Sequence, residues 1–154
     1  MTKAHKRQLA DPKGRDGSID IPGYPRLDLR FNQVLHKTPK HGNIHGVPLN
    51  EKGASDKTEA NAITMRDSII NSAKNENTKW YLNGQYQAGT PNGCDSINIF
   101  DPTNNIVTVF QKMPDGTNKF LTIFKMTPIE KNHFEATNGN LFTDRLSIIN
   151  IEEY

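Results

Sequence analysis

Two histidines and a lysine within residues 40–46, Lys-His-Gly-Asn-Ile-His-Gly, are the side chains of this sequence best suited to chemistry. Cleavage of RNA without a metal needs a base for the 2′-hydroxyl proton, an acid for the leaving oxygen and a cation near the phosphorus. Histidine suits the first two roles because its ordinary pKa, about 6.5, lies close to neutral pH. The segment therefore makes His41 and His45 the candidate acid and base, and Lys40 the candidate cation.

The same spacing has other interpretations. Histidines four residues apart can bind zinc from one face of a helix, but the surrounding glycines and prolines predict a loop, no Glu follows His41, and no third ligand is evident. We therefore expect no metal and no cofactor. Two histidines in a basic loop also arise by chance, so the alternative that this loop has no catalytic residues stays open. Cys94 is the single cysteine, which excludes an intramolecular disulfide and predicts a packed small residue.

Positive charge and histidines are concentrated towards the N-terminus. Residues 1–45 contain nine Lys or Arg and four acidic residues, whereas the rest of the chain contains ten and thirteen. A basic segment on a mildly acidic body is typical of a protein that binds a polyanion, although a solvated basic tail has the same composition. Proline and glycine between residues 11 and 30 predict an extended basic leader over residues 1–36, followed by one domain over residues 37–154.

Hydrophobic periodicity predicts a helix after the histidine segment. Two prolines and two glycines first predict a loop over residues 37–48. Asp56 can then act as the N-cap of a helix, with Glu59 at the capping-box spacing, and residues 75–77 end that helix. Apolar residues recur in it at helical intervals, at Ala62, Met65, Ile69 and Ala73.

After this helix the period changes to two, which indicates strands. Four strands are predicted, at residues 80–82, 96–100, 106–112 and 119–125. Turn sequences between them predict an antiparallel meander. Thr127, Pro128 and Glu130 then predict the start of a short helix, which Asn138 and Gly139 end. The expected fold class is α+β, with an N-terminal helix packed on a four-stranded antiparallel meander and a short C-terminal helix.

Alternation along the strands divides the predicted sheet into two faces. An aliphatic face, expected to pack against the helix, has Leu82, Ile97, Ile99, Val107, Val109, Leu121 and Ile123. The opposite face has Tyr81, Asn98, Thr108, Phe110, Lys112, Phe120 and Thr122. Such a mixed face can stack bases and hydrogen-bond phosphates. The candidate substrate-binding residues are therefore Lys37, Tyr81, Asn98, Thr108, Phe110 and Lys112. A sheet covered by the leader would use the same side chains for packing, and this alternative stays open.

Whole phrases of the sequence also carry a family resemblance. They begin with His-Gly-Asn-Ile-His-Gly-Val-Pro-Leu-Asn at residues 41–50 and continue at residues 57–62, 84–90, 97–102 and 136–143. These phrases resemble the C-terminal toxin domains of filamentous-haemagglutinin-like contact-dependent growth-inhibition proteins. The expected order of helix and sheet also resembles the barnase, EndoU, colicin and RelE-like ribonuclease fold. The general pattern of that fold, a His before the sheet and a Thr on a late strand, is matched here by His41 or His45 and by Thr122.

The resemblance implies an endoribonuclease, most often one that cleaves transfer RNA. It further implies a secreted effector tail that is delivered into the cytoplasm of a neighbouring bacterium and neutralised at home by a cognate immunity protein. A target-cell factor such as elongation factor Tu is a further expected partner. The sequence contains no run of 18 apolar residues, so it predicts no membrane-spanning helix. Two alternatives stay open, a zinc-dependent DNase toxin and a non-catalytic module that binds RNA or a protein.

Overall fold

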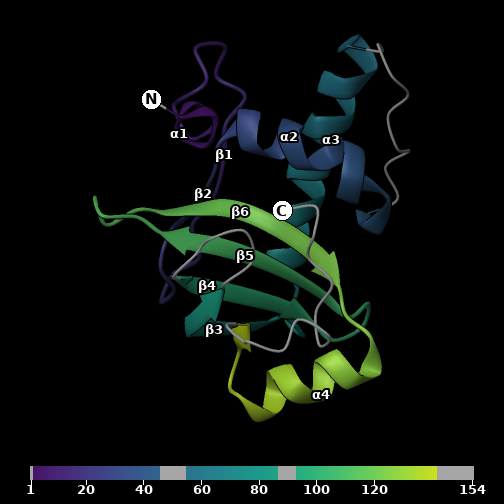
Figure 1. The fold of residues 1–154 in the computed structure, drawn as a ribbon. Coiled ribbons are helices and arrows are strands. Elements are labelled where there is room, and N and C mark those ends of the chain that lie inside the picture. The colour runs from purple at the N-terminus through teal and green to yellow at the C-terminus, as the bar shows by residue number, and fades with distance from the viewer. Residues whose placement is uncertain (1, 46–54, 87–92, 142–154) are drawn as a thin grey trace.

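A mixed sheet with helices on both of its faces organises the chain (Figure 1). The structure, a computed structural model, describes residues 2–45, 55–86 and 93–141. Its elements are α1 Lys3–Arg7, β1 Gly17–Ile19, β2 Leu27–Leu29, α2 Phe31–His41, η1 Gly42–His45, α3 Ser55–Ala73, β3 Lys79–Tyr86, β4 Cys94–Asp101, β5 Ile106–Lys112, β6 Asn118–Lys125, α4 Pro128–Ala136 and β7 Asn140–Leu141. The strand order is β1-β2-β6-β5-β4-β3-β7, with β2 parallel to β6 and β3 parallel to β7. The α+β class is therefore confirmed, but the sheet is larger than the predicted meander and is not purely antiparallel.

The predicted meander forms the centre of this sheet, as strands β3 to β6 (Figure 1). The bounds predicted for β5 match the strand Ile106–Lys112, and the other three strands extend beyond their predicted ends. Asn105 before β5 and Gly116 before β6 have φ values of 58° and 88°. Asn and Gly adopt this left-handed conformation at the lowest cost, which is why the sequence turns at these two places.

Helices α2 and α3 cover one face of the sheet, here called the helix-side face. The four apolar positions predicted for α3 are buried, with at most 2 % of each exposed: Ala62, Met65, Ile69 and Ala73. They share one core with Ile97, Ile99, Phe110, Phe120 and Ile123 of the sheet. The helix already includes Ser55, so it begins before Asp56, the predicted N-cap. The side chain of Asp56 lies outside the described residues. Within the part of the chain that the structure describes, no helix is long and apolar enough to cross a membrane.

Helix α4 covers the opposite face, here called the α4-side face. Its start is the predicted one: Thr127 accepts a hydrogen bond from the Glu130 amide, and the Glu130 carboxylate accepts one from the Thr127 amide, which is a complete capping box. Phe134 anchors the helix to the sheet, with its ring 5.6 Å from that of Phe100. Asn138 and Gly139 then adopt φ values of 57° and 85° and end the helix, as predicted.

The predicted division of the sheet into two faces is wrong, for two reasons of register. Phe100 pairs with Val107 across the β4–β5 turn, so odd-numbered residues of β4 share a face with even-numbered residues of β5. Val109 pairs with Thr122 but Phe110 pairs with Phe120, so Leu121 is an extra residue, a β-bulge. A shift of one residue moves a whole strand's side chains to the other face. Val107, Val109 and Leu121 therefore pack in a second core on the α4-side face, with Phe100 and Phe134.

The interpretation of residues 1–36 as an extended leader is also wrong. The segment holds α1, β1, β2 and the first residues of α2, so the predicted boundary after residue 36 falls inside a helix. Five of its apolar side chains have no exposed surface: Ile19, Leu27, Leu29, Phe31 and Val34. Arg15 bonds to Asp11 within the segment and links it to α3 through a hydrogen bond to Glu59, and its guanidinium lies 3.9 Å from the centre of the Phe31 ring. The sequence missed these contacts because each strand here is only three residues long.

The loop predicted over residues 37–48 is instead helical as far as it is described. Residues 37–41 complete α2, and η1 continues to His45; residues 46–48 lie outside the described part. Pro39 is exposed in the last turn of α2, where its ring meets solvent. A proline inside a helix removes one backbone hydrogen bond. Burial of Phe31, Val34 and Thr38 on the other side of the same helix offsets that loss.

Candidate functional site

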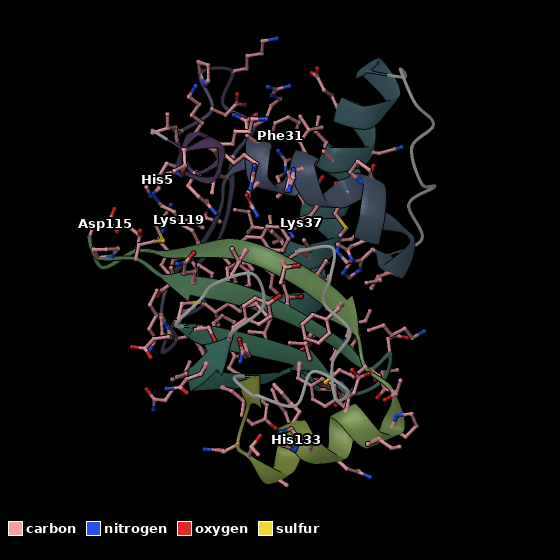
Figure 2. All side chains as sticks on the ribbon, in the orientation of Figure 1. His5, Phe31, Lys37, Asp115, Lys119 and His133 are labelled. Atoms are coloured by element: carbon pink, nitrogen blue, oxygen red, sulfur yellow. The ribbon has the colours of Figure 1, made fainter. Side chains whose placement is uncertain are left out.

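Two of the predicted residues, Lys37 and His41, lie on the side of α2 that Gln33 binds to the sheet. Gln33, Lys37 and His41 are four residues apart, so they lie along the same side of the helix. All three are buried, with 3, 2 and 8 % of their surfaces exposed. Gln33 donates from Nε2 to the carbonyl oxygen of Leu121 in β6 at 2.7 Å, which fixes this side of α2 against that strand. Figure 2 shows Lys37 between α2 and the sheet.

Lys37 lines a small pocket between the helices and strands β5 and β6. The pocket has a volume of about 70 Å³, and Gln33, Gln111 and Leu121 also line it. A buried ammonium group is costly unless polar groups surround it. The carboxamides of Gln33 and Gln111 supply polar surroundings here. A ligand must enter the pocket to reach Lys37, because only 2 % of this residue is exposed.

Three predicted residues lie in one row across the α4-side face. Tyr81 pairs with Asn98, Asn98 with Val109, and Val109 with Thr122. Directly paired residues of antiparallel strands place their side chains on the same face, and neighbouring strands are about 4.8 Å apart. The structure therefore brings Tyr81, Asn98 and Thr122 onto one face, as predicted, although Val107, Val109 and Leu121 share that face with them.

Asn98 and Tyr81 are engaged in structural contacts. Asn98 is fully buried, donates from Nδ2 to the carbonyl oxygen of Gly139 at 2.6 Å, and accepts from the Ser96 hydroxyl at 2.8 Å. Tyr81 packs edge-on against Phe134, with ring centres 4.8 Å apart. Burial raises the pKa of the Tyr81 hydroxyl, so this group is neutral near neutral pH. Both residues therefore fasten the α4–β7 segment to the sheet.

Thr122 and Lys112 are the sequence neighbours of Leu121 and Gln111, two residues that line the Lys37 pocket. Thr122 follows Leu121 in the β6 bulge, and its side chain is 3 % exposed on the α4-side face. Lys112 follows Gln111 at the end of β5 and is half-buried. Successive strand residues point to opposite faces, so Lys112 lies on the other side of the sheet from Gln111.

His45 lies elsewhere. It ends η1, is half-buried, and its Nε2 atom has no hydrogen-bond partner among the described residues. Burial lowers the pKa of His45, and the Asp101 carboxylate partly opposes this shift. Asp101 pairs with Ile106, at the opposite end of β5 from Gln111. These two ends of β5 are five residues apart, or about 17 Å at about 3.4 Å per residue. His45 interacts with Asp101 at one end and Gln111 lines the pocket at the other, so the structure does not bring His45 to the Lys37 pocket.

The remaining predicted residues do not join this site. Lys40 belongs to α2, but its side chain lies outside the described part of the chain. Thr108 is 3 % exposed and pairs with Ile99 on the helix-side face. Phe110 is fully buried against Phe120, with ring centres 6.1 Å apart. The prediction that Thr108 and Phe110 lie on an open face is wrong, and neither is accessible to a substrate in this structure.

Residues that the sequence did not single out complete the surroundings of Lys37. They are Arg7 of α1, Gln8 at the C-cap of α1, Gln33 of α2 and Gln111 of β5. The spacing of Gln33, Lys37 and His41 was a usable signal, but the prolines led to a loop prediction that hid it. No sequence pattern connects α1 to residues more than a hundred positions away.

The described residues contain no cluster of three or more His, Cys, Asp or Glu side chains that could hold a metal ion. Burial and the neighbouring Asp95 raise the pKa of the Cys94 thiol to about 11, so the reactive thiolate is scarce near neutral pH. Comparison of the chain with protein-family models and with curated protein sequences finds no match.

Proposed function

We propose that this chain is an antibacterial toxin domain that cleaves RNA, with transfer RNA as the substrate, by metal-independent acid–base transesterification. The observation that carries the proposal is one side of α2, where a buried cation, Lys37, and a buried imidazole, His41, lie one helical turn apart on the side of the helix that Gln33 binds to β6. The resemblance of whole phrases to contact-dependent inhibition toxins supplies the biological class. Helices packed on an antiparallel meander are compatible with the ribonuclease fold that many such toxins share.

His41 is the residue to which we assign proton transfer beside the phosphate. Four helical residues at about 1.5 Å each place it about 6 Å along α2 from Lys37. An acid or base must reach the reacting atoms within hydrogen-bond distance, so it has to be close to the cation that binds the phosphate. Lys37 then balances the charge that develops on the phosphoryl oxygens while the 2′-oxygen attacks phosphorus and the 5′-oxygen leaves. The products are a 2′,3′-cyclic phosphate and a 5′-hydroxyl.

His45 and Thr122 have supporting roles in this proposal. His45 lies one turn beyond His41, and its lowered pKa keeps it neutral, which is the form that accepts a proton. The RNA strand would then run along α2 from the Lys37 pocket towards η1, with Lys40 beside it. Thr122 is a positioning residue, because it lies in the bulge whose Leu121 carbonyl holds Gln33 of α2.

The partners of the proposed toxin follow from the same surface. A cognate immunity protein would present acidic side chains to α2, because charge complementarity speeds the encounter of partners and would block the site at once. Elongation factor Tu of the target cell is a further candidate partner, since the chain would act in that cytoplasm as a delivered effector tail. A stable, inhibiting complex that left residues 33–45 uncovered would contradict the prediction that acidic side chains of the immunity protein contact α2.

The test is to produce the full chain in bacteria without an immunity partner and to sequence the ends of the RNA. We expect growth arrest and transfer RNA fragments ending in a 2′,3′-cyclic phosphate, and we expect the purified chain to make the same fragments in chelator. Normal growth with confirmed folded protein would contradict the toxin. A requirement for added zinc, with DNA cut in place of RNA, would indicate the zinc-dependent DNase instead.

A further inference from the structure

The pocket beside Lys37 has a composition suited to an anion. Its polar lining consists of two cations and three carboxamides: Arg7, Lys37, Gln8, Gln33 and Gln111. None of the described residues that line it carries a carboxylate. With a volume of about 70 Å³, the pocket suits one small polar group.

Arg7 is held in place by a chain of hydrogen bonds. Arg7 donates from Nε to Gln33 Oε1 at 2.9 Å, while Gln33 donates to the Leu121 carbonyl oxygen at 2.7 Å. This chain of bonds ties α1 to α2 and α2 to β6. The Arg7 guanidinium has further N–H groups, on Nη1 and Nη2, for which the described residues provide no partner. A planar guanidinium with donors to spare is well matched to phosphate oxygens.

Gln8 supplies an independent observation that points to a ligand. It is 9 % exposed, and it donates from Nε2 to the Phe120 carbonyl oxygen at 2.9 Å. Its Oε1 atom is buried and has no hydrogen-bond partner among the residues that the structure describes. A buried acceptor without a donor costs free energy, and Oε1 cannot be satisfied by a bare anion. A ligand that carries a hydroxyl next to its phosphate would donate to Gln8 Oε1 and accept from the Arg7 guanidinium.

We infer that this pocket binds a phosphate group together with a neighbouring hydroxyl, and that α1 is therefore part of a ligand-binding site. The inference that phosphate binds depends only on the residues that line the pocket. The identification of the ligand as a ribose-phosphate unit of RNA rests on the proposed function. In that case Arg7 and Gln8 hold a phosphate of the substrate beside Lys37, in a segment whose sequence predicted only a basic leader.

The test uses the full chain and the substitution Gln111→Glu. Gln111 is half-buried, and the new carboxylate would repel an anion in the pocket without a large change in shape. Gln85→Glu in β3 is the matched control, because it introduces the same charge at an exposed strand position outside the pocket. The probe is inorganic phosphate, followed through the NMR signals of the glutamine side-chain amides, with the melting temperature of each variant recorded.

We expect Gln111→Glu to weaken phosphate binding at least tenfold, equivalent to about 1.4 kcal/mol, while Gln85→Glu leaves it unchanged. Equal affinity in both variants, or no saturable binding to the unmodified chain, would overturn the inference. If Gln111→Glu does not fold, Arg7→Gln replaces it and is compared with Lys6→Gln, an exposed neighbour in α1. That pair must show the same tenfold difference.

Transfer RNA cleavage by the same variants separates this inference from the proposed function. If phosphate binds the pocket but the unmodified chain leaves transfer RNA intact, the proposed function is wrong and the inference that the pocket binds phosphate is kept. If the unmodified chain cleaves transfer RNA and Gln111→Glu cleaves it equally fast, the pocket is not the substrate's phosphate site and the proposed function stands.

Discussion

At the scale of single residues, the polar side chains of this chain are distinguished by burial more than by type. His41 and Lys37 are almost fully enclosed, whereas His5 and His133, which have the same chemistry as His41, lie on α1 and α4 (Figure 2). The sequence identified His41 and Lys37 by type and by the basic surroundings. It gave no signal for Gln111, because a glutamine acquires a role only from the cation beside it.

His45 gives a pH dependence of stability whose sign can be worked out. Burial lowers the pKa of His45 in the folded chain below its ordinary value of 6.5, so the unfolded chain binds this proton more tightly. Stability from this group is present above about pH 6.5 and is lost as pH falls through the lowered pKa. We expect His45→Gln to lose less stability than the unmodified chain between pH 7.5 and 5. If the melting temperatures of the two proteins fell by the same amount over this pH range, the burial of His45 would be contradicted.

At the scale of elements, strand positions were predictable and side-chain faces were not. The strand Ile106–Lys112 and the capping box at Thr127 follow from local patterns that the structure retains. The faces depend on the β4–β5 register and on the β-bulge at Leu121, and neither leaves a local signal. Helix α2 was missed for the opposite reason, because a strong local signal, Pro39, is outweighed by tertiary burial.

Two glycines test the contact between β3 and the end of α4. Gly139 and Gly23 both have positive φ values, 85° and 87°. A Cβ at Gly139 would lie 2.5 Å from the Tyr81 Cβ, whereas one at Gly23 would have nothing within 4 Å. Gly23→Ala should therefore cost only the left-handed backbone, about 1–2 kcal/mol, and Gly139→Ala about 1–3 kcal/mol more from overpacking. Chemical denaturation measures both, and equal losses would mean that Tyr81 does not pack there.

At the scale of the whole molecule, the N-terminal third is structural and carries part of the proposed site. Strand β2 pairs with β6, and β1–β2 together with α2 completes the helix-side core. The surplus of positive charge in residues 1–45 is therefore charge on the folded body and not on a tail. It includes Arg7 and Lys37, which line the pocket.

Two shortened chains test this organisation. A chain that starts at residue 37 loses Ile19, Leu27 and Phe31 from the core, and loss of several large buried side chains exceeds the usual stability of about 5–15 kcal/mol. We expect it to lack a cooperative melting transition. A chain that starts at residue 11 keeps that core and lacks α1, so we expect it to melt cooperatively and to bind phosphate weakly. A cooperatively folded 37–154 chain would contradict the integration of the N-terminal segment.

The central claim is that His41 moves a proton in RNA cleavage, and single-turnover cleavage of transfer RNA by His41→Gln tests it most directly. His133→Gln is the matched control, because His133 lies on α4, on the other side of the sheet from α2 (Figure 2). General acid and base groups each contribute about 100- to 10,000-fold to the rate. We predict that His41→Gln lowers the rate at least about 100-fold, that His133→Gln leaves it unchanged, and that both variants keep the melting temperature of the unmodified chain. A folded His41→Gln variant that cleaves as fast as His133→Gln would contradict the account.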